Sequence, residues 1–197
     1  MLTQNQTLKY LEINAISKLF GAMSIPSSFL PLLTTGLRHN TSLQQLNVYI
    51  PLNEEIRTFI NVISQKNNLT ELKVNFKPDQ SYSNCSRDKK EQIMTLLFYE
   101  QLLPAVTNML QSHATIRLLR VVCRNINKES SQPNWIELVL HLYEIIFIHP
   151  SLEYIEIHTG LYDASRLLVD TLKDQKKTLI DRHRKEQPHK PLPIVKF

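Results

Sequence analysis

Glycine is scarce in this sequence, with only 3 Gly among 197 residues. Gly supplies the positive φ angles and the close backbone approach that phosphate-binding loops require. Neither Gly36 nor Gly160 stands in a nucleotide-binding motif, and no Walker A sequence is present. The composition therefore argues against a Gly-rich nucleotide site.

Motifs for metal binding and catalysis are also missing. The 2 cysteines, Cys85 and Cys123, form no CxxC pair, so neither a zinc site nor a thiol redox motif is predicted. The 7 His show no HExxH or other paired ligand spacing, and GxSxG is absent. Cys123 follows two valines, and we expect it to pack as a small apolar residue. We therefore predict no enzyme, no catalytic residue, no metal and no cofactor.

No hydrophobic run is long enough to span a bilayer. The longest, residues 136–148, contains Glu137, His141 and Glu144, and is shorter than the roughly 20 apolar residues that a membrane helix needs. Met1 is followed by polar residues that do not resemble a signal peptide. These features predict a cytoplasmic protein in a reducing compartment.

The net charge of +5 is concentrated near the C-terminus. Residues 173–197 contain eight Lys and Arg against three acidic residues, which equals the net charge of the whole chain. Such a run is usually a solvated helix face or chain end. A contact with nucleic acid or an anionic lipid surface through this basic tail is the alternative.

A nine-residue pattern, [N/K/H]-x-[T/S/N]-L-x-x-L-x-[V/I], recurs five times with Ile replacing Leu in two places. All three apolar slots are filled in every copy, and such self-similarity is the signature of a repeat protein. The copies are NQTLKYLEI from Asn5, NTSLQQLNV from Asn40, KNNLTELKV from Lys66, HATIRLLRV from His113 and HPSLEYIEI from His149.

The spacing within each copy indicates a turn followed by a strand. The last two apolar slots alternate with a period of two, which is typical of a strand. The first residue of the copy stands where a preceding helix must end, and Asn there favours the left-handed conformation. The hydroxyl or amide side chain in the third slot can bond nearby backbone groups as the chain leaves the turn.

Apolar residues at helical spacing precede every copy but the first, and they also follow the last. Helices and strands therefore alternate, which predicts a parallel sheet with the helices covering one side. Each unit is too small to bury its own apolar faces, so neighbouring units must stack. The helical faces are Phe29, Leu32, Leu33 and Leu37; Ile56, Phe59, Ile60 and Ile63; Ile93 to Leu110, with Pro104 as a start or kink; Trp135 to Ile146; and Ala164 to Ile180.

These residues resemble leucine-rich repeats, most closely the ribonuclease-inhibitor-like subclass that also forms the C-terminal arms of NOD-like receptors. The resemblance implies an α/β solenoid of about five repeats, with a curved parallel sheet on the concave side and helices on the convex side. Residues 1–163 would form the solenoid, 164–187 a C-terminal capping helix and 188–197 a basic tail.

The sequence departs from that family in two respects. The family places Asn or Cys eight residues after the first Leu, and we expect no Asn ladder because other residues stand there. The copies are also unevenly spaced, which makes residues 77–90 and 124–134 expanded surface loops, or alternatively a binding loop or phosphorylation site. The residues in the Asn slot are Ile16, Pro51, Lys77, Arg124 and Gly160.

The resemblance implies a non-catalytic module that binds a protein partner through the concave sheet face. Such an arm would serve a NOD-like receptor in innate immunity, or alternatively recruit substrates to a ubiquitin ligase. Exposed Tyr and Arg are enriched at interface hot spots, although these side chains could also be merely solvated. The candidate contact residues are Tyr10, Glu12, Gln45, Asn47, Tyr49, Glu71, Lys73, Arg120, Tyr154, Glu156 and His158.

Overall fold

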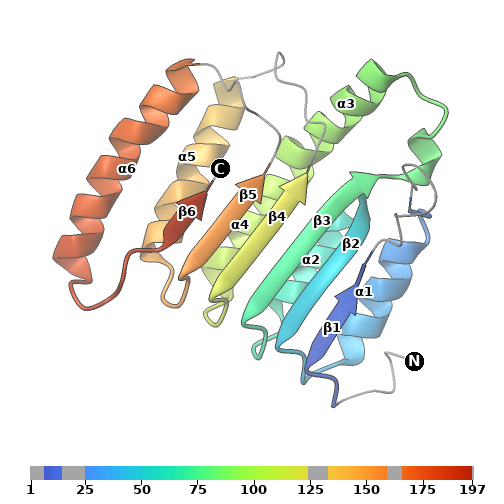
Figure 1. The fold of residues 1–197 in the computed structure, drawn as a ribbon, viewed down its shortest axis with the longest axis horizontal. Coiled ribbons are helices and arrows are strands. Elements are labelled where there is room, and N and C mark those ends of the chain that lie inside the picture. The colour runs from blue at the N-terminus through green and yellow to red at the C-terminus, as the bar shows by residue number, and fades with distance from the viewer. Residues whose placement is uncertain (1–6, 15–24, 124–132, 159–165, 197) are drawn as a thin grey trace.

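The computed structural model describes residues 7–14, 25–123, 133–158 and 166–196. The chain has an α/β fold with a six-stranded, all-parallel sheet in which the strands lie side by side in sequence order (Figure 1). The strands are β1 Tyr10–Ile13, β2 Gln45–Leu52, β3 Glu71–Pro78, β4 Leu118–Cys123, β5 Tyr154–His158 and β6 Ile194–Lys196. The α-helices are α1 Phe29–His39, α2 Ile56–Ser64, α3 Arg87–Leu96, α4 Leu103–Ser112, α5 Pro133–Ile148 and α6 Arg166–Glu186.

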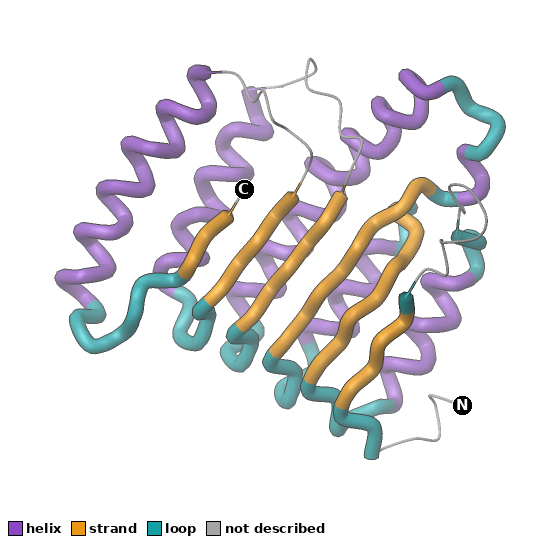
Figure 2. Tube along the Cα trace, viewed as in Figure 1, coloured by secondary structure: helices purple, strands orange, loops and turns teal. Residues whose placement is uncertain are grey.

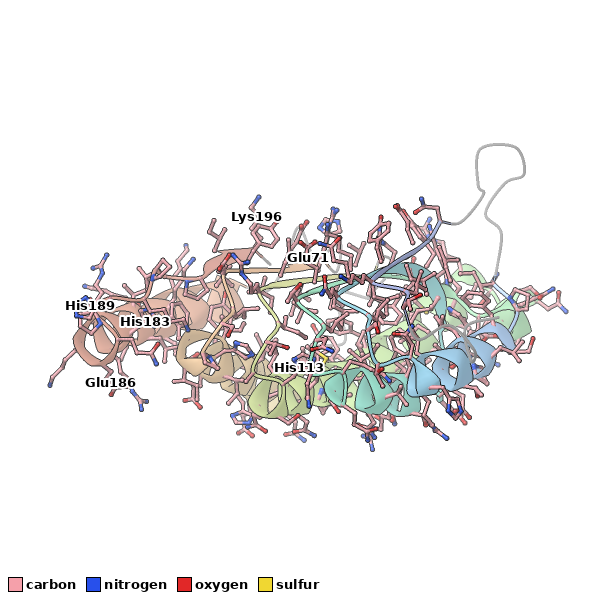
Figure 3. All side chains as sticks on the ribbon, turned by 90° about the horizontal axis from the view of Figure 1, so that it is seen from below. Glu71, His113, His183, Glu186, His189 and Lys196 are labelled. Carbon is pink, nitrogen blue, oxygen red and sulfur yellow. The ribbon has the colours of Figure 1, made fainter. Side chains whose placement is uncertain are left out.

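The described helices form one layer against one face of the sheet (Figure 2). Neighbouring helices pack in the same sequential order as the strands, α1 on α2, α2 on α4, α4 on α5 and α5 on α6. The side chains of Glu71 and Lys196 lie on the opposite side of the sheet from the helices (Figure 3). The alternation of strands and helices predicted from the repeat is therefore confirmed.

The three apolar slots of the repeat supply the centre of the core. They are buried in the second to fifth copies and only half-buried in the first, because β1 is an edge strand with a neighbour on one side. Burying a Leu or Val side chain stabilises the fold by about 1.5–3 kcal/mol. The buried residues are Leu43, Leu46, Val48, Leu69, Leu72, Val74, Ile116, Leu119, Val121, Leu152, Ile155 and Ile157.

The sheet contains a sixth strand that the sequence analysis did not predict. β6 pairs in parallel with β5 and lies within residues 188–197, which we expected to form a basic tail. Leu192 and Val195 pack against the core, so HKPLPIVKF, starting at His189, acts as a sixth copy of the repeat. Proline has no N–H to donate to a sheet, and prolines are therefore confined to sheet edges and strand starts. Pro191 and Pro193 lie just before this edge strand.

Two residues assigned to predicted helix faces are exposed, Leu96 of α3 and Leu32 of α1. Leu32 of α1 is 71% exposed, whereas Leu30 is 0% exposed and packs in the core with Leu33 and Leu37. Five of the first nine residues of this helix are apolar, and they cover more than half of its circumference. Their spacing alone therefore does not show which of them are buried.

Pro104 marks the start of α4, as the sequence predicts. A π-helical segment, Leu97–Leu102, joins α3 to α4 just before it. Proline lacks the N–H that would bond the carbonyl four residues earlier. That carbonyl, Glu100 O, accepts a hydrogen bond from Nη2 of Arg57 at 2.7 Å instead.

In the second and fifth copies the first residue caps the turn through its side chain. Asn40 Oδ1 accepts from the backbone N–H of Ser42 at 3.0 Å and of Leu43 at 2.9 Å. His149 Nδ1 accepts from the equivalent N–H groups of Ser151 and Leu152 at 3.2 and 3.0 Å. Asn40 has φ −85° and ψ 123°, so the predicted left-handed backbone is wrong and the side chain alone explains this position.

Lysines at this slot or next to it link two of the units to the preceding one. Lys66 Nζ donates to the carbonyl of Asn40 at 2.7 Å, and Lys190 Nζ donates to that of His149. Both nitrogens of the His149 ring are engaged, because Nε2 lies 2.8 Å from the carbonyl of His113. A polar ladder therefore runs along the edge of the sheet where the strands begin.

A second inter-unit contact lies at the carboxyl ends of β2 and β3, where we expected no Asn ladder. Asn53 Nδ2 donates to Asp79 Oδ2 at 2.7 Å across two units. Asp79 also accepts from Ser27 Oγ at 2.6 Å and from the N–H of Ser81 at 2.8 Å. This polar pair lies two residues beyond the family slot, which holds Pro51 and Lys77 in these two units.

We expect stability to fall as the pH drops from about 7 to about 5, because burial lowers the pKa of His113 and His149 in the folded protein. The nearby Lys190 ammonium lowers the pKa of His149 further. An unfolded His has a pKa of about 6.5, so only the unfolded chain binds protons just below that pH. The stabilisation is complete above about 7 and is lost as the pH falls. Thermal melts across this range measure the loss.

His149→Asn should reduce that pH dependence and leave the part due to His113, since Asn40 makes the same two turn contacts without titrating. His189→Asn is the matched control, because His189 is exposed and the substitution should leave the profile unchanged. A melting temperature that does not change between pH 7 and 5 in the native protein would contradict the prediction.

Candidate functional site

The open face of the sheet, defined as the side opposite the helices, carries three rows of side chains. The parallel register places equivalent positions of every copy next to one another across the strands. The first row is Tyr10, Gln45, Glu71, Leu118, Tyr154 and Ile194. The middle row is Glu12, Asn47, Lys73, Arg120, Glu156 and Lys196. The third row is Tyr49, Asn75, Val122 and His158.

All eleven candidate contact residues belong to these rows, and each is exposed or half-buried. The structure thus brings together on one face the residues that the repeat pattern selected. Their role in binding stays a prediction. Four further residues of this face were absent from the candidate set but were visible as slots of the repeat or as its neighbours: Asn75, Lys77, Leu118 and Val122.

Two more face residues, Ile194 and Lys196, come from the unpredicted β6. The signal that could have revealed them is the His-x-x-Leu-x-x-Val spacing from His189. Extending the repeat search through the prolines to the end of the chain would have found it.

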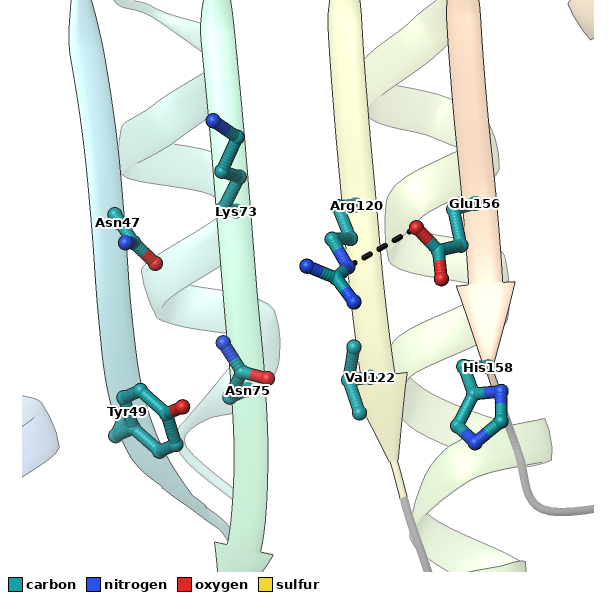
Figure 4. Close-up of a pocket in the computed structure, with 8 residues that line it drawn as sticks. All are labelled: Asn47, Tyr49, Lys73, Asn75, Arg120, Val122, Glu156 and His158. Atoms are coloured by element: carbon teal, nitrogen blue, oxygen red, sulfur yellow. Dashed lines mark ion pairs between the residues drawn. The ribbon is translucent and has the colours of Figure 1, made fainter. Parts of the chain in front are cut away.

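A shallow hollow of about 420 Å³ lies in the middle and third rows, over β2 to β5 (Figure 4). Its lining is almost entirely polar, with two amides, one phenol, one imidazole, one carboxylate and the basic side chains of Lys73 and Arg120. The lining residues are Asn47, Tyr49, Lys73, Asn75, Arg120, Val122, Glu156 and His158.

A chain of contacts runs from β4 to β6 and orders the β4 and β5 side of the hollow. Arg120 Nε lies 3.0 Å from Oε2 of Glu156, as the dashed line in Figure 4 shows. The same carboxylate oxygen accepts from the hydroxyl of Tyr154 at 2.9 Å. The ammonium of Lys196 lies 5.6 Å from the centre of the Tyr154 ring, within cation–π range. Glu156 is therefore held by two donors from two different strands.

The β2 and β3 side of the hollow is ordered more loosely. Lys73 Nζ lies 3.5 Å from the carboxylate of Glu71, which also accepts from Gln45 Nε2 at 3.2 Å. Lys77 Nζ lies 6.0 Å from the centre of the Tyr49 ring.

At the β1 edge, Glu12 accepts hydrogen bonds from the Tyr10 hydroxyl and from Asn14 and Asn47 at 2.9 and 3.0 Å. These bonds, that from Tyr10 first, lower the pKa of Glu12. The Tyr–Glu contact repeats that of Tyr154 with Glu156 in β5, so two fixed carboxylates flank the centre of the face.

The basic C-terminal residues are partly engaged within the fold. Arg182 pairs with Glu186 at 3.0 Å, and Arg184 lies 4.0 Å from Asp181. Lys190 belongs to the polar ladder described above. Part of the positive charge that binding through the basic tail would require is therefore paired within the fold.

The described residues contain no group of three His, Cys, Asp or Glu side chains suited to a metal ion. Cys123 is fully buried, and burial raises the pKa of its thiol far above the usual range. Cys123 therefore packs as the apolar residue that we predicted.

The two expanded segments differ in what the structure shows. Within 77–90, Asp79 is buried, and Ser86 Oγ accepts from the N–H of Lys89 at 3.4 Å at the start of α3. Of the predicted loop 124–134, residues 124–132 lie outside the described part of the chain.

None of the described helices is both long and apolar enough to cross a membrane. Comparisons with protein-family models, with curated proteins and with solved structures find no match to this chain.

Proposed function

We propose that the chain is a leucine-rich-repeat solenoid that acts as a non-catalytic binding module and contacts a protein partner through the open face. The fold supports this proposal, since six equivalent strands lie in sequence order with the described helices on one side only. In such a solenoid the open face is the concave one. A NOD-like-receptor arm is the setting that the sequence resemblance favours, and it stays at the level of analogy.

The observation that carries the proposal is the register of the three rows. Loops of very different length separate the strands, yet equivalent side chains align laterally across all six. The result is a continuous surface with Tyr and Arg at its centre, and these residue types dominate interface hot spots. Its cross-strand contacts hold many of these side chains in place before binding, which reduces the entropy lost on association.

Simultaneous replacement of Tyr49, Arg120 and Tyr154 by alanine is expected to abolish partner binding and leave the fold intact. The reason is that all three lie on the open face, and hot-spot truncations each cost at least about 2 kcal/mol of binding energy. A photo-crosslinking amino acid placed at Asn47 of the native chain and of the triple variant, followed by identification of the crosslinked protein, measures the loss.

A matched triple variant tests whether the open face is specific. Thr58, Asn108 and Lys177 are exposed on α2, α4 and α6, and their replacement by alanine should leave crosslinking unchanged. Circular dichroism and thermal melts of both variants establish that each is folded. If the open-face variant retains its crosslinked partner at the native yield, the proposed function is refuted.

A further inference from the structure

We infer that the hollow on the open face takes acidic side chains, so that the partner presents an acidic, extended segment to Lys73 and Arg120. This inference rests on the proposed function and adds the chemistry of the partner. It is carried by the placement of charge across the middle row.

Two like charges lie side by side at the centre of that row. Lys73 of β3 and Arg120 of β4 are register partners on adjacent strands. Like charges directly opposite each other destabilise a sheet. Glu71 and Glu156 offset part of this cost, and both cations line the hollow, where a ligand has room to approach. A carboxylate between the two cations would convert the repulsion into two favourable contacts.

The cations are arranged so that such a carboxylate can enter. Figure 4 shows the ammonium of Lys73 turned away from Arg120, and the two terminal nitrogens of Arg120 turned towards β3 and Val122. Nε of Arg120 pairs with Glu156, and the terminal nitrogens, which face β3 and Val122, can donate to a ligand. The space between the two side chains belongs to the hollow. Guanidinium groups bind carboxylates through two parallel N–H donors.

The remaining lining makes a carboxylate preferable to a phosphate. Asn75 and Tyr49 add neutral donors, which suit either anion. Glu156 lines the same hollow, and its negative charge would repel a doubly charged phosphate more strongly than a singly charged carboxylate. The acidic residues Glu12 and Glu156 on either side of the basic centre further favour a partner whose acidic residues are clustered rather than spread across the whole face.

The test is a titration of the isotope-labelled full chain, followed by amide chemical shifts, with a tetrapeptide of glutamate blocked at both ends. We expect shifts at Lys73, Asn75 and Arg120, and none with the matching glutamine tetrapeptide. Arg120→Gln should weaken binding by about tenfold, since a charge-assisted hydrogen bond is lost. Arg117→Gln is the matched control, because Arg117 pairs with Glu153 at 2.8 Å just before the same two strands and outside the hollow. Its affinity should stay within about twofold.

Four results would overturn the inference: equal binding of the glutamine peptide, no loss in Arg120→Gln, shifts that map to the basic side of α6, or tighter binding of inorganic phosphate than of the glutamate peptide. The outcome is separable from that of the proposed function. If the peptide fails but the Tyr49, Arg120 and Tyr154 variant still loses its crosslinked partner, the open face binds protein of a different charge. If that variant keeps its partner, the proposed function fails whatever the peptide does.

Discussion

Replacing Leu30 with alanine is expected to lower the free energy of unfolding by about 3 kcal/mol, whereas Leu32→Ala should change it by less than about 0.5 kcal/mol. Leu30 is 0% exposed and Leu32 is 71% exposed, although both belong to α1 and are separated by one residue. Truncating a buried Leu removes its transfer free energy and leaves a cavity that the core fills only in part. An exposed Leu loses neither.

Urea denaturation of the two variants, with the native chain as reference, measures this difference. Both substitutions replace Leu by Ala in one helix, so differences in helix propensity cancel. Equal destabilisation would mean that α1 is rotated towards the face that the sequence pattern suggested, with Leu32 in the core.

Replacing Asp79 with alanine is expected to lower the free energy of unfolding by about 3 kcal/mol, because it leaves three hydrogen-bond donors without an acceptor at the carboxyl ends of β2 and β3. The donors are Ser27 Oγ, Asn53 Nδ2 and the N–H of Ser81, and Asp79 itself is buried. Asp174→Ala serves as the control, since Asp174 is exposed on α6. It should remain within about 0.5 kcal/mol of the native chain.

The pH dependence of the Asp79 variant supplies a second measurement. Burial alone would raise the pKa of Asp79, but hydrogen bonds from Ser27, Ser81 and Asn53 outweigh burial and lower it. A lowered carboxyl pKa stabilises the fold above the unfolded value of about 3.9, and this stabilisation is lost as the pH falls through the folded value. Asp79→Ala should therefore lose less stability than the native chain between pH 5 and pH 2. Parallel acid titrations of the two proteins would contradict the assigned hydrogen bonds.

The sequence alone determined which residues of each copy face the core and which face the other side of the sheet. Three apolar slots recur with fixed internal spacing, and period-two alternation sends the residues between them to the other face of each strand. Because equivalent positions pair in a parallel sheet of equivalent units, Glu12, Asn47, Lys73, Arg120 and Glu156 align whatever the length of the loops between them. The fold class and the candidate residues were therefore predictable together.

The last unit was not predicted from the same pattern because it contains prolines. HKPLPIVKF keeps the helix-stop residue and the three apolar slots, but its two prolines and its basic surroundings resemble an unfolded tail. Pairing with β5 makes this segment a strand. Ile194 is the register partner of Tyr154, and the N–H of Ile194 donates to the carbonyl of Glu153 at 2.8 Å. A strand of three residues has too little pattern of its own to be predicted without that neighbour.

The partners of the polar side chains were decided only by the tertiary structure. Asn53 and Asp79 lie 26 residues apart and meet because β2 and β3 are adjacent. Arg120 could have paired with any acid of its row, and the contact with Glu156 follows from β5 lying beside β4 and from the Tyr154 hydroxyl that fixes the carboxylate. The shape of the hollow depends on these same contacts between strands. Local spacing sets which way a side chain points, whereas the group it meets depends on which unit stacks against it.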